Sequence, residues 1–69
     1  MEYAVRITFD EEAAVWIAES DEILGLVLEC GSLNALMERV QIAVPELLVL
    51  NKQPSCDKIQ FKIEQQNRI

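Results

Sequence analysis

Histidine is absent from this sequence of 69 residues. Its absence excludes histidine general bases, histidine metal ligands and the Ser–His or Cys–His pairs of many nucleophilic enzymes. Cysteine is scarce, and Cys30 and Cys56 lack the CxxC spacing of a zinc or redox site. We therefore expect two reduced thiols. We also expect no catalytic residues, no metal and no cofactor.

Glycine, basic residues and long apolar runs are also scarce. The 2 glycines, Gly25 and Gly31, are isolated and form no phosphate-binding GxGxxG or Walker pattern. The net charge of −6, from 6 basic and 12 acidic residues, argues against nucleic acid as a direct partner. No apolar run approaches the roughly 18 residues of a membrane span. No signal peptide opens the chain, so we expect a cytoplasmic protein with no membrane partner.

The sequence is rich in apolar residues, which make up 51% of the chain. This content is typical of a folded domain and excludes a disordered tail. A chain of this length is too short for two cores, so residues 1–69 are expected to form a single domain.

Four segments have the pattern of β-strands, with apolar residues that recur at a period of two. These segments are residues 3–9, 14–20, 26–30 and 58–64. The second of them carries apolar groups on both faces, with Trp16 and Ala18 on one and Val15 and Ile17 on the other. A surface strand of a monomer rarely needs two apolar faces.

Residues 33–48 have the pattern of an amphipathic helix. The apolar stripe consists of Leu33, Leu36, Met37, Val40, Val44, Leu47 and Leu48. Ser32 is a good N-cap because its hydroxyl can accept a hydrogen bond from an amide of the first turn, and Asn51 can end the helix. Pro45 lacks an amide donor and crowds the preceding turn, so we expect a kink or a second short helix there.

The order of these elements predicts an α+β fold, β-β-β-α-β. Short connections make the first three strands an antiparallel meander, and the helix returns the chain so that the last strand runs parallel to the first. The product is a four-stranded mixed sheet with one long helix on one face. The helix should pack on Val5, Ile7, Phe61 and Ile63, or on their sheet-mates on the same face. The second face has no element to cover it.

The uncovered face predicts a homodimer. Val15, Ile17 and Val27 add apolar side chains to this face, and monomers rarely expose a large contiguous apolar patch. Isologous pairing of two copies is the commonest way to bury such a patch. We therefore expect these residues at a dimer interface.

Acidic residues gather at the two hairpin connections. Glu11 and Glu12 lie in the first connection, and Glu19, Asp21 and Glu22 surround the second. Such clusters can keep a protein soluble or attract a basic partner. They can also bind a metal, but no DxDxDG loop supports that alternative here. If the domain has a basic partner, these residues are the expected partner-binding surface.

Three stretches of the sequence resemble the HicB-like antitoxin domain, in a branch of stand-alone domains of unknown function. They are Tyr3–Asp10 as a first strand, Val15–Val27 as an aromatic strand with its loop, and Ser32–Leu36 as a capped helix start. Ser20 and Leu24 stand where the antitoxins have prolines. The resemblance implies a partial ribonuclease-H-like sheet without that enzyme's carboxylate array.

The resemblance also implies a function. HicB-like domains neutralise a small basic toxin that cleaves messenger RNA, by covering its catalytic surface. This chain is therefore expected to be a non-enzymatic interaction module with such a toxin as its partner. Full-length HicB antitoxins add a DNA-binding domain, but we expect a single HicB-like domain over residues 1–69 and no separate DNA-binding domain. The alternative is a small homodimeric ligand-binding or scaffolding domain with no toxin partner.

Overall fold

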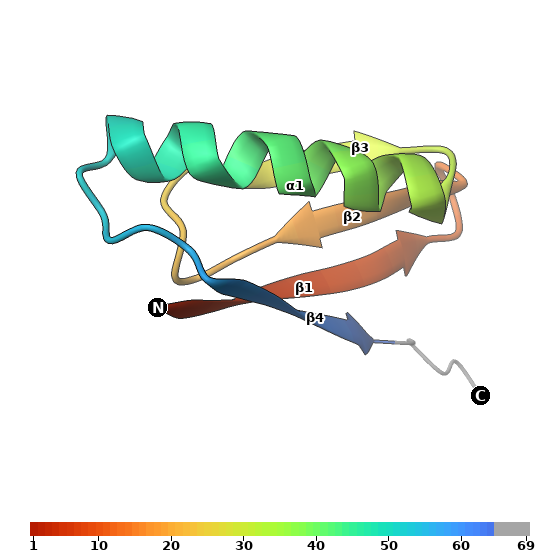
Figure 1. Cartoon of the computed structure of the whole chain (residues 1–69). Helices are drawn as coiled ribbons and strands as arrows, with labels where there is room; N and C mark the ends of the chain where they lie inside the picture. Colours follow the sequence, from red (N-terminus) through yellow and green to blue (C-terminus); the bar gives the residue numbers. More distant parts are fainter. Residues whose placement is uncertain (65–69) are drawn as a thin grey trace.

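The computed structural model describes residues 1–64 and confirms the expected order β-β-β-α-β (Figure 1). Its elements are β1 (Glu2–Asp10), β2 (Val15–Glu19), β3 (Val27–Cys30), α1 (Leu33–Leu50) and β4 (Lys58–Glu64). The bounds of β4 are those expected, and the bounds of the other elements differ from those expected by at most two residues. Local periodicity was therefore sufficient to place every element.

The strands form one sheet in the order β3-β2-β1-β4. β2 runs antiparallel to both β1 and β3, whereas β4 runs parallel to β1. A parallel neighbour requires a crossover connection, which α1 supplies. The predicted mixed sheet of an α+β fold is thus confirmed.

The core lies between α1 and one face of the sheet. Alternate residues of β1 point into it, and Val5 and Ile7 are fully buried. The helix contributes Leu36, Val40, Val44 and Leu48. Ile23 and Leu26 from the loop between β2 and β3 are buried as deeply, at 0% and 2% exposure. These loop residues complete the core, although the sequence pattern placed the first in a surface connection.

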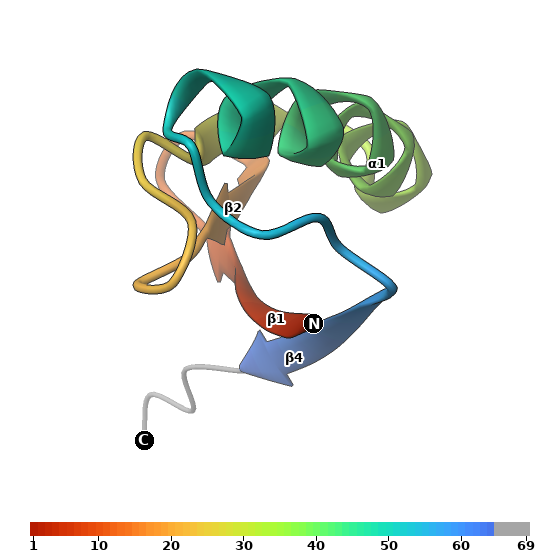
Figure 2. The same cartoon turned by 60° about the vertical axis from the view of Figure 1, so that its left-hand side comes forward.

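The helix covers only part of this face. It lies over β2 and β3, whereas β4 is at the far edge of the sheet, as Figures 1 and 2 show. The side chain of Ile63 is consequently 53% exposed, so the helix packs on the sheet-mates of Ile63 in β2 and β3 and not on Ile63 itself. The cause is the connection Gly31–Ser32, which is so short that the helix has to begin beside β3.

Pro45 does not interrupt α1, which is continuous from Leu33 to Leu50, so of the two expected alternatives, a kink or a second short helix, the second helix is absent. Pro45 removes the hydrogen bond to the carbonyl of Gln41, but both residues are exposed and water can replace it. The predicted caps are confirmed. Ser32 Oγ accepts a hydrogen bond from the Ala35 amide, and Asn51 is the C-cap.

Candidate partner-binding surface

The structure separates the two acidic clusters. Glu11 and Glu12 lie in the turn between β1 and β2, whereas Asp21 and Glu22 lie in the loop between β2 and β3, at the opposite end of the sheet. The β1–β2 ladder between them extends from the Arg6–Glu19 pair to the Asp10–Val15 pair. Four residues of strand span roughly 14 Å. One compact docking site cannot include all five predicted residues.

The second cluster borders an open groove with a volume of about 250 Å³. The strand residues that line the groove all lie on one face of the sheet, the face opposite α1. We call it the helix-free face. The charged side chains of the groove are Arg6, Glu19, Asp21, Glu22, Lys62 and Glu64. They come from three strands and one loop, and the carboxylates outnumber the cations. The sequence pattern did not indicate that β4 contributes to this groove.

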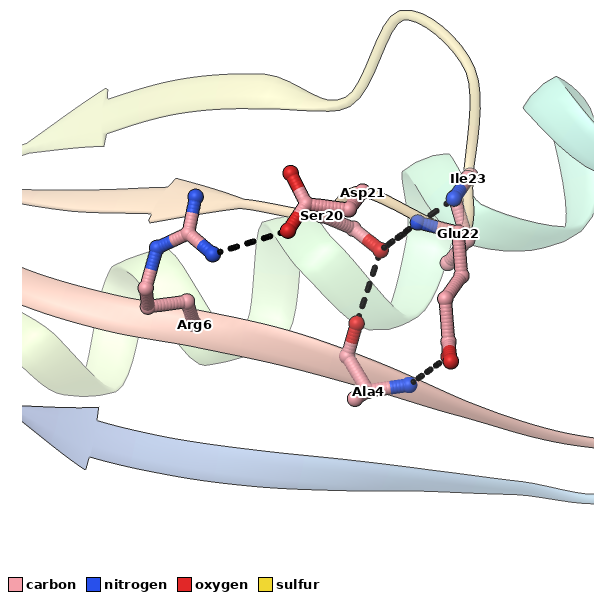
Figure 3. A network of polar contacts seen from close by, with 6 residues as sticks. All are labelled: Ala4, Arg6, Ser20, Asp21, Glu22 and Ile23. Atoms are coloured by element: carbon pink, nitrogen blue, oxygen red, sulfur yellow. Dashed lines mark hydrogen bonds and ion pairs between the residues drawn. The ribbon is translucent and has the colours of Figure 1, made fainter.

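Ser20 organises the groove, as Figure 3 shows. Its hydroxyl accepts hydrogen bonds from the amides of Glu22 and Ile23, both at 3.1 Å, and donates one to the carbonyl of Ala4 at 2.7 Å. β2 ends at Glu19, so Ala4 of β1 has no strand residue opposite it. The Ser20 side chain takes the place of the missing strand, a role that the sequence analysis did not assign.

Two carboxylates of the loop are held by β1. The Glu22 carboxylate accepts a hydrogen bond from the Ala4 amide at 2.6 Å, so this side chain also extends the sheet. Asp21 pairs with Arg6, with 3.3 Å between Oδ2 and Nη1. The Asp21 side chain is 86% exposed, and surface ion pairs of this kind contribute at most about 1 kcal/mol. Asp21 therefore remains accessible to a partner.

The end of α1 holds the same loop from the other side. Asn51 Nδ2 donates a hydrogen bond to the Leu24 carbonyl, and Gln53 Nε2 donates one to the Glu22 carbonyl, both at 2.8 Å. Gly25 in this loop has a φ of +82°, a conformation that residues with a side chain rarely adopt. These contacts fix the backbone that carries the acidic groups.

Tyr3 lies under this region in the core. Its side chain is 3% exposed, and its hydroxyl donates a hydrogen bond to the Pro54 carbonyl at 2.7 Å. Burial raises the pKa of the Tyr3 hydroxyl above its usual value, and the nearby Cys56 and Glu22 add to the rise. This hydrogen bond ties the start of β1 to the segment that leads into β4.

The residues expected at a dimer interface lie together on the helix-free face. Val15 and Ile17 are half-buried, and Val27 is 63% exposed. Polar residues separate them, because Val27 is paired with Glu19 and Ile17 with Glu29 across the β2–β3 ladder. The apolar surface on this face is therefore small and interrupted by charge, and its role in a dimer stays a prediction.

Neither cysteine forms a disulfide, and both are half-buried, with Cys30 at the end of β3 and Cys56 in the loop before β4. Within residues 1–64, no three acidic or cysteine side chains are grouped closely enough to hold a metal ion. The helix of this part of the chain is not long and apolar enough to cross a membrane.

A family model described as a domain of unknown function, DUF1902, matches residues 2–69. The chain belongs to this family. The chain is similar in fold to a solved structure, that of the hypothetical protein TTHA1013 from the extreme thermophile Thermus thermophilus. It is 32% identical, with a TM-score of 0.79 over 100% of this chain and 97% of that one. Comparison with curated proteins gave no match. Neither similarity names an activity or a partner for DUF1902.

Proposed function

We propose that this DUF1902 domain is a non-enzymatic protein-interaction module, which binds a basic partner protein at the groove on its helix-free face. One observation carries the proposal. Carboxylates from β2, from the loop after it and from β4 surround an open groove, and hydrogen bonds from two other elements hold the loop in place.

The geometry suits a basic side chain of a partner. Asp21 is mostly exposed, and Glu19 makes no ion pair within residues 1–64. A lysine or arginine entering the groove can pair with these carboxylates without first separating a strong ion pair. Because the loop is already ordered, binding loses little conformational entropy there. The net charge of −6 would also steer a basic protein toward the domain.

The resemblance to HicB-like antitoxins suggests a specific partner of this chemistry. It is a small basic toxin that cleaves RNA, whose RNA-binding surface would be covered by the domain. Toxins and antitoxins are commonly encoded side by side. A basic reading frame of similar size next to the gene for this chain is therefore the first candidate to test.

The test is the association rate of the domain with the purified product of that reading frame, at low and high salt. We expect Asp21→Lys to slow association several-fold at low salt and to have less effect at high salt, because salt screens exposed charges. Glu11→Lys is the matched control, since it makes the same charge change at the other end of the sheet.

Equal slowing by both variants would show that net charge steers the partner and that the groove is not its site. Unchanged rates for Asp21→Lys at both salt concentrations would contradict the proposal. Asp21 is preferred to Glu22 for this experiment because Glu22 accepts a backbone hydrogen bond, so its replacement also affects the fold.

A further inference from the structure

The two edge strands of the sheet differ in length, and α1 lies beside only one of them. β3 is a strand of 4 residues beside α1, whereas β4 has 7 residues and lies at the edge away from the helix (Figures 1 and 2). Among the elements of residues 1–64, β4 contacts β1 alone, so its other edge is uncovered in this part of the chain. A long uncovered edge strand is a template for pairing with another chain. Natural monomers usually shorten or cover such edges.

The backbone groups that face this free edge can be assigned. Ala4 directs its amide to Glu22 and its carbonyl to Ser20, so both groups point toward the β2 side of β1. Because the direction of the backbone groups alternates along a strand, the amides and carbonyls of Tyr3, Val5 and Ile7 point toward β4.

In a parallel ladder each such residue bonds to the neighbours of the residue opposite it. Tyr3 lies opposite Ile59, and the register continues with Val5 opposite Phe61 and Ile7 opposite Ile63. The residues of β4 that bond to β1 are therefore the even-numbered ones. The amides and carbonyls of Ile59, Phe61 and Ile63 face the free edge.

The sequence of β4 is complementary to an inverted copy of itself. When two copies are aligned antiparallel about Phe61, Ile59 lies opposite Ile63 of the second copy, and Phe61 lies opposite its own equivalent. On the other face Lys58 lies opposite Glu64. Moving the centre by one residue, to Gln60 or to Lys62, places lysine opposite lysine. Charge thus favours the register centred on Phe61 over the two registers next to it.

We propose that the chain forms a homodimer in which β4 pairs antiparallel with β4 of a second copy about Phe61. The pairing joins the two sheets into one. Ile59, Phe61 and Ile63 of one copy would each exchange backbone hydrogen bonds with the residue opposite. This interface differs from the one on the helix-free face that Val15 and Ile17 predicted, and it does not depend on the proposed partner.

The pairing also accounts for apolar surface that α1 leaves open. Phe61 is half-buried, and Ile63 is 53% exposed on the face that the helix covers elsewhere. In the dimer these side chains contact Phe61 and Ile59 of the second copy. The twofold axis runs through the sheet, so both helix-free faces point the same way. The dimer would present two acidic grooves on one surface.

A charge-reversal cycle tests the register by sedimentation equilibrium at micromolar to submillimolar concentrations. Lys58→Glu places Glu opposite Glu at both ends of the interface, and we expect it to raise the dimer Kd by about tenfold. Glu64→Lys should do the same. The double variant Lys58→Glu with Glu64→Lys restores opposite charges and should return the Kd to near the original value. Arg39→Glu on the exposed side of α1 is the control and should leave it unchanged.

Residue-resolved hydrogen exchange tests the interface itself. In the dimer the amides of Ile59, Phe61 and Ile63 should be protected as well as those of Gln60 and Lys62. A dimer in which the first set exchanges freely would place the interface elsewhere and overturn the proposal. A mass of 7.9 kDa at all concentrations would also overturn it. Neither result bears on the proposed function, because the partner assay uses Asp21 and Glu11.

Discussion

The two acidic connections of this domain have similar sequences of charges but different structures. The turn between β1 and β2 is closed by the last residue of β1, because Asp10 Oδ1 accepts hydrogen bonds from the amides of Glu12 and Ala13 at 3.0 and 3.3 Å. Its tip is exposed. The loop between β2 and β3 is held by β1 and by the end of α1, and it buries Ile23 and Leu26 in the core.

This difference bears on function because the cost of ordering a site reduces the affinity of that site. Carboxylates on the β1–β2 turn can attract a cation, but their positions depend on a short local turn. Those at the β2–β3 loop keep defined positions around a groove. The same composition therefore gives a solvated turn at one end of the sheet and a candidate binding surface at the other.

Truncation of the loop's buried side chain should have the largest effect. Ile23 is 0% exposed, so Ile23→Ala should lower the free energy of unfolding by about 2–5 kcal/mol. Leu24→Ala next to it is the control, because Leu24 is 63% exposed, and it should cost less than about 0.5 kcal/mol. Denaturant unfolding of both variants checks this. If Ile23→Ala lowered the free energy of unfolding as little as Leu24→Ala, the loop would not be part of the core.

The hydroxyl of Ser20 should come next. Ser20→Ala leaves the amides of Glu22 and Ile23 and the carbonyl of Ala4 without this partner, so we expect a loss of about 1–3 kcal/mol. Asp10→Ala removes the matching acceptor of the other turn. Water can reach those amides, so its cost should be under about 1 kcal/mol. If Asp10→Ala proved the more damaging in urea melts, the contrast between the two connections would be reversed.

The smallest effect is expected at the end of the β1–β2 turn. Ala14 has a φ of 54°, in the left-handed region that disfavours residues with a Cβ atom. Ala14→Gly removes this strain, although glycine also gains freedom in the unfolded chain. We expect a net stabilisation of about 0.5 kcal/mol, visible as a small rise in Tm. A clear loss of stability would show that the turn is not strained at this residue.

The elements of the fold could be predicted from the sequence because their signals are local. The alternation of residues 58–64 and the cap at Ser32 depend on neighbours in the chain. The position of α1 over β2 and β3 could not be predicted in this way. It depends on how a short connection combines with the order of strands in the sheet, and the exposure of Ile63 follows from that order.

The organisation of the groove was hidden for a similar reason. The acidic residues were visible as charges, but Ser20 acts on Ala4, and Gln53 acts on Glu22, 31 residues away. No sequence pattern marks Gln53 for this role. The Ser20 hydroxyl bonds to amides two and three residues further along the chain, which is typical of a serine turn. This local pattern was the one available signal. Long-range hydrogen bonds thus determined which acidic connection borders the groove.

The central claim is that a basic partner docks at the β2–β3 loop and not at the β1–β2 turn. The most direct measurement is an NMR titration of the ¹⁵N-labelled domain with the candidate partner, the product of a basic reading frame next to its gene. The amides of Ala4, Arg6 and residues 20–23 should shift on binding, whereas those of residues 11–13 should not. Shifts confined to residues 11–13, or to the exposed side of α1, would contradict the account.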